Sequence, residues 1–344
     1  MRAMPLSMID KGRPMQTYRF TLRPLSAFGT PLAGDTLFGQ LCWTLRHQMG
    51  NVRLTEFLNG YTKGEPFAVL SDALPAGHVP LPNVPSETWQ KSTETNAPDR
   101  KALKKKKWLS IDDMAKPLVQ WQSLAKSDAE VAPAAATPIE RAQPHNTINR
   151  QTGTTGEGQF APYAMPQIWF HPAMQFDLYV VLDEARLNVA ELTAALVYMG
   201  QVGFGRDASI GLGKFALDGD AVPSRHLNEG AAATTGAQAN SYLTLGPCAP
   251  QGLGFCPVRS SYQVATRFGR HGDAAVQSGQ PFKRPVLLAK AGGLFWPETI
   301  DAARQFIGQG LGGTVNPVSL AMPETVQQGY APVIAIARPL ENTV

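Results

Sequence analysis

The stretch GFGRDASIGLGKF, from Gly203 to Phe215, combines four glycines with two cations. Glycine has no Cβ, so its amide approaches an anion closely, and successive amides in a turn form a concave site for phosphate. Arg206 and Lys214 add positive charge beside these amides, and Ser209 adds a hydroxyl. We therefore expect the loop to contact a phosphate backbone through Gly203, Gly205, Arg206, Ser209, Gly211, Gly213 and Lys214.

Two familiar phosphate-binding motifs do not fit this loop. A P-loop requires Ser or Thr after its Gly-Lys pair, whereas Phe215 follows Lys214 here. A dinucleotide-binding turn follows a strand and opens a helix, but residues 188–202 have the apolar spacing of a helix. The loop is therefore expected to leave a helix and enter a strand at 214–217. The alternative to phosphate contact is a loop that packs on a neighbouring protein subunit.

Two further segments carry side chains suited to single-stranded nucleic acid. The connector 26–34 places Phe28 and Thr30 before a helix start, where a ring can stack on a base and amides can bind phosphate. Burial of Phe28 is the equal alternative, and Asp35 is expected to cap the helix. Residues 145–160 are typical of a protruding polar turn, which is either an ordinary hairpin or a reader of unstacked bases. The hydrogen-bonding side chains there are His145, Asn146, Asn149 and Arg150.

Basic residues elsewhere allow two interpretations. Arg259 and Arg267 lie in a locally basic second half and extend a cationic groove if their strands share a face; otherwise they are scattered surface charges. The octet RKALKKKK (100–107) holds six cations, so the rest of a chain of net charge +4 sums to −2. Such a run is more often a solvated surface than a nucleic-acid contact.

The composition is that of a globular protein of a reducing compartment. The 344 residues are long enough for two domains, and 43% of them are hydrophobic. The three cysteines form no CxxC pair and the six histidines are widely separated, so we expect no disulfide framework, metal site or cofactor. The absence of a long apolar run argues against membrane insertion, and a cytoplasmic location is expected.

The apolar patterns predict an α+β protein with two ferredoxin-like (RRM-like) domains. The order βα…ββαβ across residues 15–220 is typical of this fold, and the break in pattern at about 71–166 predicts a large insertion with mobile parts. Residues 1–14 are expected to be a disordered extension, and residues 221–240 a linker. The second, degenerate domain is expected to span residues 241–344 and to include a helix that begins at Pro297.

Several stretches, taken in order, resemble one family. They are LRPLSAFGTPLAGDTLFGQLCW, FAVLSDALPAGHVPLP, HNTINRQTGTTGEGQF, GFGRDASIGLGKF, RPVLLAKAG and QGYAPVIAIA, which together cover most of Met15 to Arg338. This combination resembles RAMP-superfamily CRISPR proteins, and most closely the fourth subunit of type III-A (Csm) effector complexes. The resemblance assigns no role to the lysine run at 104–107.

The resemblance implies a non-catalytic scaffold that binds guide RNA. Such a subunit holds the 5′ handle of the crRNA, inserts a β-hairpin near the junction of handle and guide, and meets target RNA only indirectly. It also docks the large polymerase-like subunit and the backbone RAMP subunit. Residues 145–160 are the expected place of the hairpin. Two alternatives stay open: a metal-independent RAMP endoribonuclease that processes repeat RNA with His145 as its base, and a purely structural subunit without RNA contact.

Overall fold

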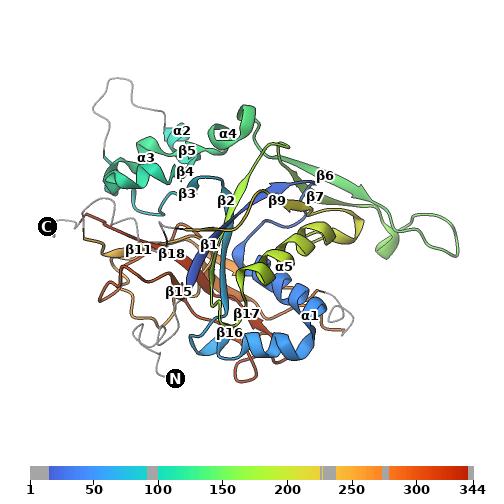
Figure 1. Ribbon diagram of the computed structural model, residues 1–344. Coiled ribbons are helices and arrows are strands. Elements are labelled where there is room, and N and C mark those ends of the chain that lie inside the picture. The colour runs from blue at the N-terminus through green and yellow to red at the C-terminus, as the bar shows by residue number, and fades with distance from the viewer. Residues whose placement is uncertain (1–14, 91–99, 225–226, 228–237, 273–278, 340–344) are drawn as a thin grey trace.

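The computed structural model describes residues 15–90, 100–224, 227, 238–272 and 279–339. The expected extension 1–14 and most of the expected linker 221–240 lie outside these residues. The two largest sheets of the described chain are antiparallel, with two long helices on one side, a small insertion unit on the other, and a hairpin that projects outward (Figure 1). The α+β prediction is confirmed in this general form.

The first sheet is built from strands on both sides of the insertion. Its strands are β1 (Gln16–Pro24), β2 (Ala68–Pro75), β8 (Phe176–Leu182), β9 (Phe215–Leu217) and β10 (Val222–Pro223). They pair in the order β10-β1-β8-β2, with β9 also beside β1, and every pairing is antiparallel. Helix α1 (Gly34–Leu58) follows β1, and helix α5 (Val189–Val202) follows β8. This is the connectivity expected for a ferredoxin-like domain.

Local sequence signals define both helices. Asn188 and Glu191 form a complete capping box at the start of α5, with the Asn188 side chain accepting from the Glu191 amide at 2.9 Å. Gly50 has a positive φ of 86° and divides α1 into two helical pieces, as a glycine after a helix end should. The facing sides of α1 and α5 bury leucines such as Leu41 and Leu196, and this burial holds both helices on the sheet.

The insertion lies between β2 and β8. Residues 71–75, expected at its start, belong to β2. The inserted chain forms a three-stranded sheet of β3 (His78–Pro80), β4 (Lys106–Ser110) and β5 (Lys126–Ser127). Three short helices accompany it, α2 (Arg100–Lys105), α3 (Trp121–Leu124) and α4 (Asp128–Val131). Strands β6 (Ile139–His145) and β7 (Tyr163–Trp169) then pair as an exposed hairpin that extends away from the body (Figure 1).

Across residues 238–272 and 279–339, strands are the regular elements that form. The sheet of this second half has the order β14 (Leu294–Phe295), β11 (Ser241–Thr244), β18 (Tyr330–Ile336), β15 (Phe306–Gly308). Two small ribbons join it, β12 (Val264–Arg267) with β13 (Val286–Ala289), and β16 (Leu311–Gly312) with β17 (Val326–Gln327). Within 238–272 and 279–339 no α-helix forms, so the second part shows a four-stranded antiparallel sheet without the helices of a complete ferredoxin-like unit.

The helix expected from Pro297 is wrong. The amide of Asp301 donates to the Tyr242 hydroxyl at 2.9 Å, and Phe306 pairs with Pro332 at the edge of the sheet. These contacts tie the segment, which forms bends and a turn before β15, to the sheet, and this tertiary packing outweighs local helix propensity.

Buried polar contacts join the two halves. The side-chain amide of Gln328 receives the Leu70 N–H at 2.9 Å and donates to the Leu70 carbonyl at 2.8 Å, and the Tyr330 hydroxyl donates to the Tyr61 carbonyl at 2.7 Å. Strand β18 therefore sits against β2 as a continuation of the core, because leaving these buried groups unpaired would cost free energy.

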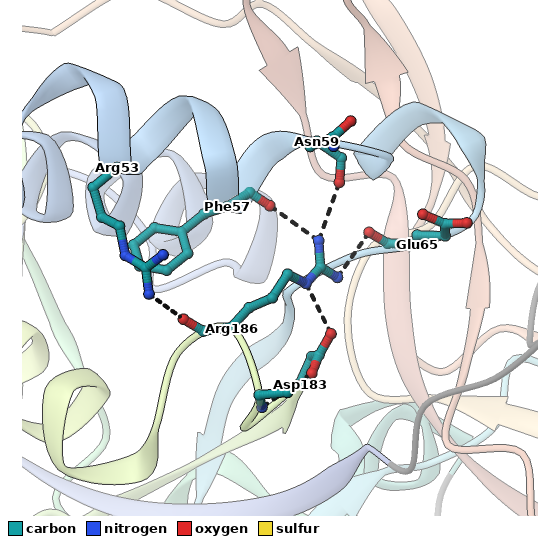
Figure 2. A network of polar contacts seen from close by, with 7 residues as sticks. Arg53, Phe57, Asn59, Glu65, Asp183 and Arg186 are labelled. Atoms are coloured by element: carbon teal, nitrogen blue, oxygen red, sulfur yellow. Dashed lines mark hydrogen bonds and ion pairs between the residues drawn. The ribbon is translucent and has the colours of Figure 1, made fainter.

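Arg186 ties the loop after β8 to the end of α1 (Figure 2). Its Nε donates to Asp183 at 2.8 Å, and its two terminal nitrogens donate to the carbonyls of Phe57, Asn59 and Glu65 at 3.0–3.2 Å. The planar guanidinium thus satisfies four acceptors at once, which a lysine ammonium in that place would not match in geometry.

Candidate nucleic-acid interface

Three segments far apart in sequence meet at one place, which we call the junction. They are the connector residues 26–30, the hairpin base 166–168 and the glycine loop 203–214. Phe28 and Ile168 exchange two backbone hydrogen bonds of 2.9 Å, and the Gly213 amide donates to the Ala27 carbonyl at 2.7 Å. The projecting hairpin and the glycine loop are therefore held together through the connector.

Arg206 is the side chain that reaches all three segments. Its amide donates to the Thr30 hydroxyl at 2.9 Å, and its guanidinium donates to the Pro166 carbonyl. The guanidinium also lies 3.6 Å from the carboxylate of Asp207. Arg206 is thus half-buried and engaged within the chain, so its first role is to fasten the loop to the connector and the hairpin.

Two of the loop glycines are needed for close packing. A Cβ on Gly213 would lie 2.0 Å from the Phe204 carbonyl oxygen, and a Cβ on Gly203 would lie 2.4 Å from that of Leu212. Both glycines also have positive φ, 72° and 104°. Both glycines are buried, and the amides of Gly213 and Gly203 donate to the carbonyls of Ala27 and Met199. The expectation that these two amides face phosphate is therefore corrected. Glycine is required at both positions because only a residue without a Cβ lets the two arms of the loop touch.

The middle of the loop keeps unused donors. The amides of Gly205, Asp207, Ala208 and Ser209 have no acceptor among the described residues, whereas the Gly211 amide donates to Ala208. Asp207 has a positive φ of 63°, a left-handed conformation of the kind found in turns whose successive amides bind an anion. Ser209 and Lys214 are exposed beside them. The anion-binding geometry thus centres on residues 205–209, with Lys214 as the exposed cation.

Phe28 is a core residue rather than a stacking surface. Its side chain is 1% exposed and packs edge-to-face on Phe170 with ring centroids 5.9 Å apart. Of the two alternatives expected for Phe28, burial is therefore correct and stacking on a base is excluded, because β7 covers the connector. Thr30, half-buried, uses its hydroxyl to hold the Arg206 amide.

The hairpin tip lies where the sequence placed it. Asn146 and Arg150 are exposed, and Asn149 stabilises the turn by accepting from the Gln151 amide at 2.9 Å. His145 stacks on Tyr163 across the hairpin with ring centroids 5.2 Å apart. No acid or second base contacts His145 among the described side chains, so the geometry shows a stacked imidazole rather than an acid–base pair.

Sequence reasoning missed the aromatic side chains of the hairpin. Tyr163 is 50% exposed and Trp169 is 44% exposed, and exposed rings of this kind offer stacking surfaces for bases. The sequence YAMPQIWF has the pattern of a core strand. Its rings are exposed only because β7 pairs with β6, whose own residues project into solvent.

The two arginines of the second half lie apart from this arrangement. The Arg259 guanidinium stacks over Trp296 at 4.9 Å, and that of Arg267 pairs with the buried Asp35 at 3.1 Å. Neither has a contact with the junction among the described residues. Asp35 is not the helix cap: the N-cap is Ala33, and the Gly34 amide is bound by Asp72 from β2 at 2.8 Å.

Asp72 has an unusual environment for a carboxylate. Burial raises its pKa from 3.8 to about 7, against the lowering effect of the Gly34 amide. Since the unfolded chain releases this proton near its ordinary pKa, the folded state binds more protons between pH 4 and 7. The free energy of unfolding should therefore fall as pH rises through this window.

Asp72→Asn tests this directly. The amide oxygen keeps the bond from Gly34, and the penalty of ionisation disappears. We expect the variant to be more stable than the parent at pH 8 by on the order of 2 kcal/mol, with little difference at pH 4. Chemical denaturation at both pH values measures this, with the exposed Asp112→Asn as the matched control. An equal effect at both pH values would contradict the assignment.

Metal and membrane signals are both absent from the part of the chain that is described. No group of three or more His, Cys, Asp or Glu side chains gathers there in a metal-binding arrangement. The described helices include none that is long and apolar enough to span a membrane.

Comparison with known proteins finds solved structures that have a similar fold. No family model matches the sequence, and no curated protein is significantly similar. The crystal structure of a Csm1–Csm4 cassette with AMPPNP contains a chain that aligns over 94% of this chain and 100% of its own length, with 14% identity and a TM-score of 0.55. In the crystal structure of a Csm1–Csm4 cassette with cA4, the aligned chain covers 94% of this chain and 100% of its own length, with 14% identity and a TM-score of 0.54.

A Csm3–Csm4 subcomplex of the type III-A CRISPR–Cas interference complex aligns equally well. It covers 93% of this chain and 99% of its own, with 14% identity and a TM-score of 0.56. Csm4 is the subunit that these structures share. Over almost its whole length, the chain therefore has the fold of Csm4.

Proposed function

We propose that this chain is the non-catalytic guide-RNA-binding subunit of a type III CRISPR effector complex. In this role it grips the 5′ handle of the crRNA with the glycine loop and places the projecting hairpin beside the RNA strand. The observation that carries the proposal is the junction, because it joins amides that have no acceptor among the described residues and a projecting polar hairpin into one unit on a Csm4 fold.

The proposed contacts divide into two kinds. Phosphate contacts come from the unused amides of residues 205–209 and from the ammonium of Lys214, and these position RNA without reading its sequence. Contacts to bases come from the hairpin, where Asn146 and Arg150 offer hydrogen bonds and Tyr163 offers a ring. The rings and polar groups at the tip would separate one nucleotide from its neighbours.

The proposed protein partners follow from the structures that share the fold. Csm4 is solved there with Csm1 and with Csm3. We propose a large polymerase-like partner and a backbone RAMP partner for this chain, with target RNA meeting it indirectly through the guide.

Guide-RNA affinity of the double variant Arg150→Ala/Lys214→Ala tests the proposal. Both side chains are exposed and make no contact with the described residues, so the fold should be unchanged. We expect weaker binding of handle-containing RNA and a salt dependence that is shallower by about one power of salt for each phosphate contact removed. Filter binding at several salt concentrations provides the measurement, and the double variant Lys63→Ala/Lys116→Ala, at two exposed lysines outside the junction, serves as the charge-matched control.

The alternatives predict different results in this binding experiment and in a cleavage assay with repeat RNA. A purely structural subunit predicts negligible affinity for guide RNA and no change in the double variant. An endoribonuclease predicts handle-length products from repeat RNA that disappear in His145→Ala. Either outcome would replace the proposal.

A further inference from the structure

A cleft of about 530 Å³ lies where the connector, the end of β2, the insertion and the second half meet. Its size is within the range of small-ligand sites. The lysine run of the insertion forms one wall, through Lys104, Lys106 and Lys107, and Trp108 continues that wall. Asn83, in the loop after β3, and Gln263, in the second half, also line the cleft. The cleft is thus built by four segments and includes the basic run to which the resemblance assigns no role.

The three ammonium groups are only partly used by the protein. Lys106 Nζ donates to the Ser123 carbonyl at 2.9 Å, and Lys107 Nζ pairs with Asp128 at 2.7 Å. Lys104 is exposed and donates to none of the described residues. An ammonium has three hydrogens to donate, so each lysine keeps donors for an anion.

The opposing charge in the cleft is small. Among the described residues that line it, Asp72 carries the only carboxylate, and that carboxylate accepts from the Gly34 amide at 2.8 Å. Lys107 is balanced by Asp128, so Lys104 and Lys106 against Asp72 leave the wall with a net positive charge, which favours an anion.

The rest of the lining suits a planar heterocycle. Trp108 is held in place by its Nε1–H, which donates to Asp128 at 2.7 Å. Asn83 is fixed through its Nδ2, which donates to the Ala291 carbonyl at 3.3 Å, and its Oδ1 accepts from no described residue. A fixed indole with side-chain amides nearby can stack on a base and hydrogen-bond to its edge.

We propose that this cleft binds a nucleotide, with its phosphates against Lys104, Lys106 and Lys107 and its base near Trp108. The nucleotide is either free or one unit of a single RNA strand, since both present the same phosphate and base. The site is separate from the glycine loop, so it does not depend on the handle-binding role proposed above.

The test compares two neighbouring lysines in the full chain. Lys104 lines the cleft, whereas Lys105 is exposed in the same run and does not line it. Binding of ATP and of a single-stranded hexaribonucleotide is measured by titration calorimetry. The background is Arg150→Ala/Lys214→Ala, which removes cations of the proposed handle site.

We expect Lys104→Ala to weaken binding by about five- to tenfold, the effect of losing one charged hydrogen bond, and Lys105→Ala to change it less than about twofold. Tighter binding of ATP than of the hexamer identifies a free nucleotide, and the reverse identifies a unit of a strand. Absence of saturable binding for both ligands overturns the proposal. An equal loss in the two lysine variants does so too, because it would show a diffuse attraction to the basic run.

Discussion

Replacing Gly213 by alanine is expected to dismantle the junction, whereas the same change at Gly211 should leave it intact. Both glycines lie in one loop and have positive φ, 72° and 98°. They differ in their surroundings: a Cβ on Gly213 would lie 2.0 Å from the Phe204 carbonyl oxygen, while a Cβ on Gly211 would meet no atom within 4 Å. The pair therefore separates crowding from backbone strain.

The magnitudes follow from these two effects. Alanine in a left-handed conformation costs about 1–2 kcal/mol, and inserted volume in a packed site costs about 1–3 kcal/mol more. We expect Gly213→Ala to lower the free energy of unfolding by about 3 kcal/mol, and Gly211→Ala by about 1 kcal/mol. Urea denaturation of both variants measures the difference.

RNA binding adds a second readout. If the junction positions the hairpin and the loop amides, Gly213→Ala should lose most of its affinity for guide RNA even below its unfolding transition. Gly211→Ala should keep most of it. Equal affinities in the two variants would show that the junction does not organise the RNA site.

Arg186→Ala is expected to be the most destabilising change at an ion pair of the first domain. The Asp183 side chain is 4% exposed, and the substitution leaves its carboxylate without its guanidinium (Figure 2). It also removes the donor from two backbone carbonyls at the end of α1 and from that of Glu65 further along the chain. Loss of one partner from a buried pair costs about 3–5 kcal/mol.

Arg53→Ala is the matched control. Arg53 also donates to Glu56 and to the Arg186 carbonyl, but its side chain is 42% exposed, so its removal should cost less than about 1 kcal/mol. Arg186→Lys should recover little of the lost stability, because an ammonium lacks the planar set of N–H donors that reaches Asp183 and the carbonyls together. Thermal and urea unfolding of the three variants, compared with the parent, test this ranking. Full stability of Arg186→Lys would show that charge alone matters there.

The sequence by itself determined the features that depend on neighbours within a few residues. The apolar spacing of residues 188–202 predicted α5, whose start is set by the nearby capping box of Asn188 and Glu191. The polar turn at 145–160 and the order of elements through 15–220 were also readable, because turns, caps and helix faces are set by residues close together in the chain.

Only the tertiary structure decided what these residues contact. Phe28 is buried because β7 pairs with the connector 140 residues earlier, and Asp35 faces Arg267 because Asp72 already binds the first amide of α1. The segment after Pro297 forms bends and a turn instead of a helix because Tyr242 and β18 bind it. Burial and close approach depend on partners that are distant in sequence, and a local sequence pattern does not identify those partners.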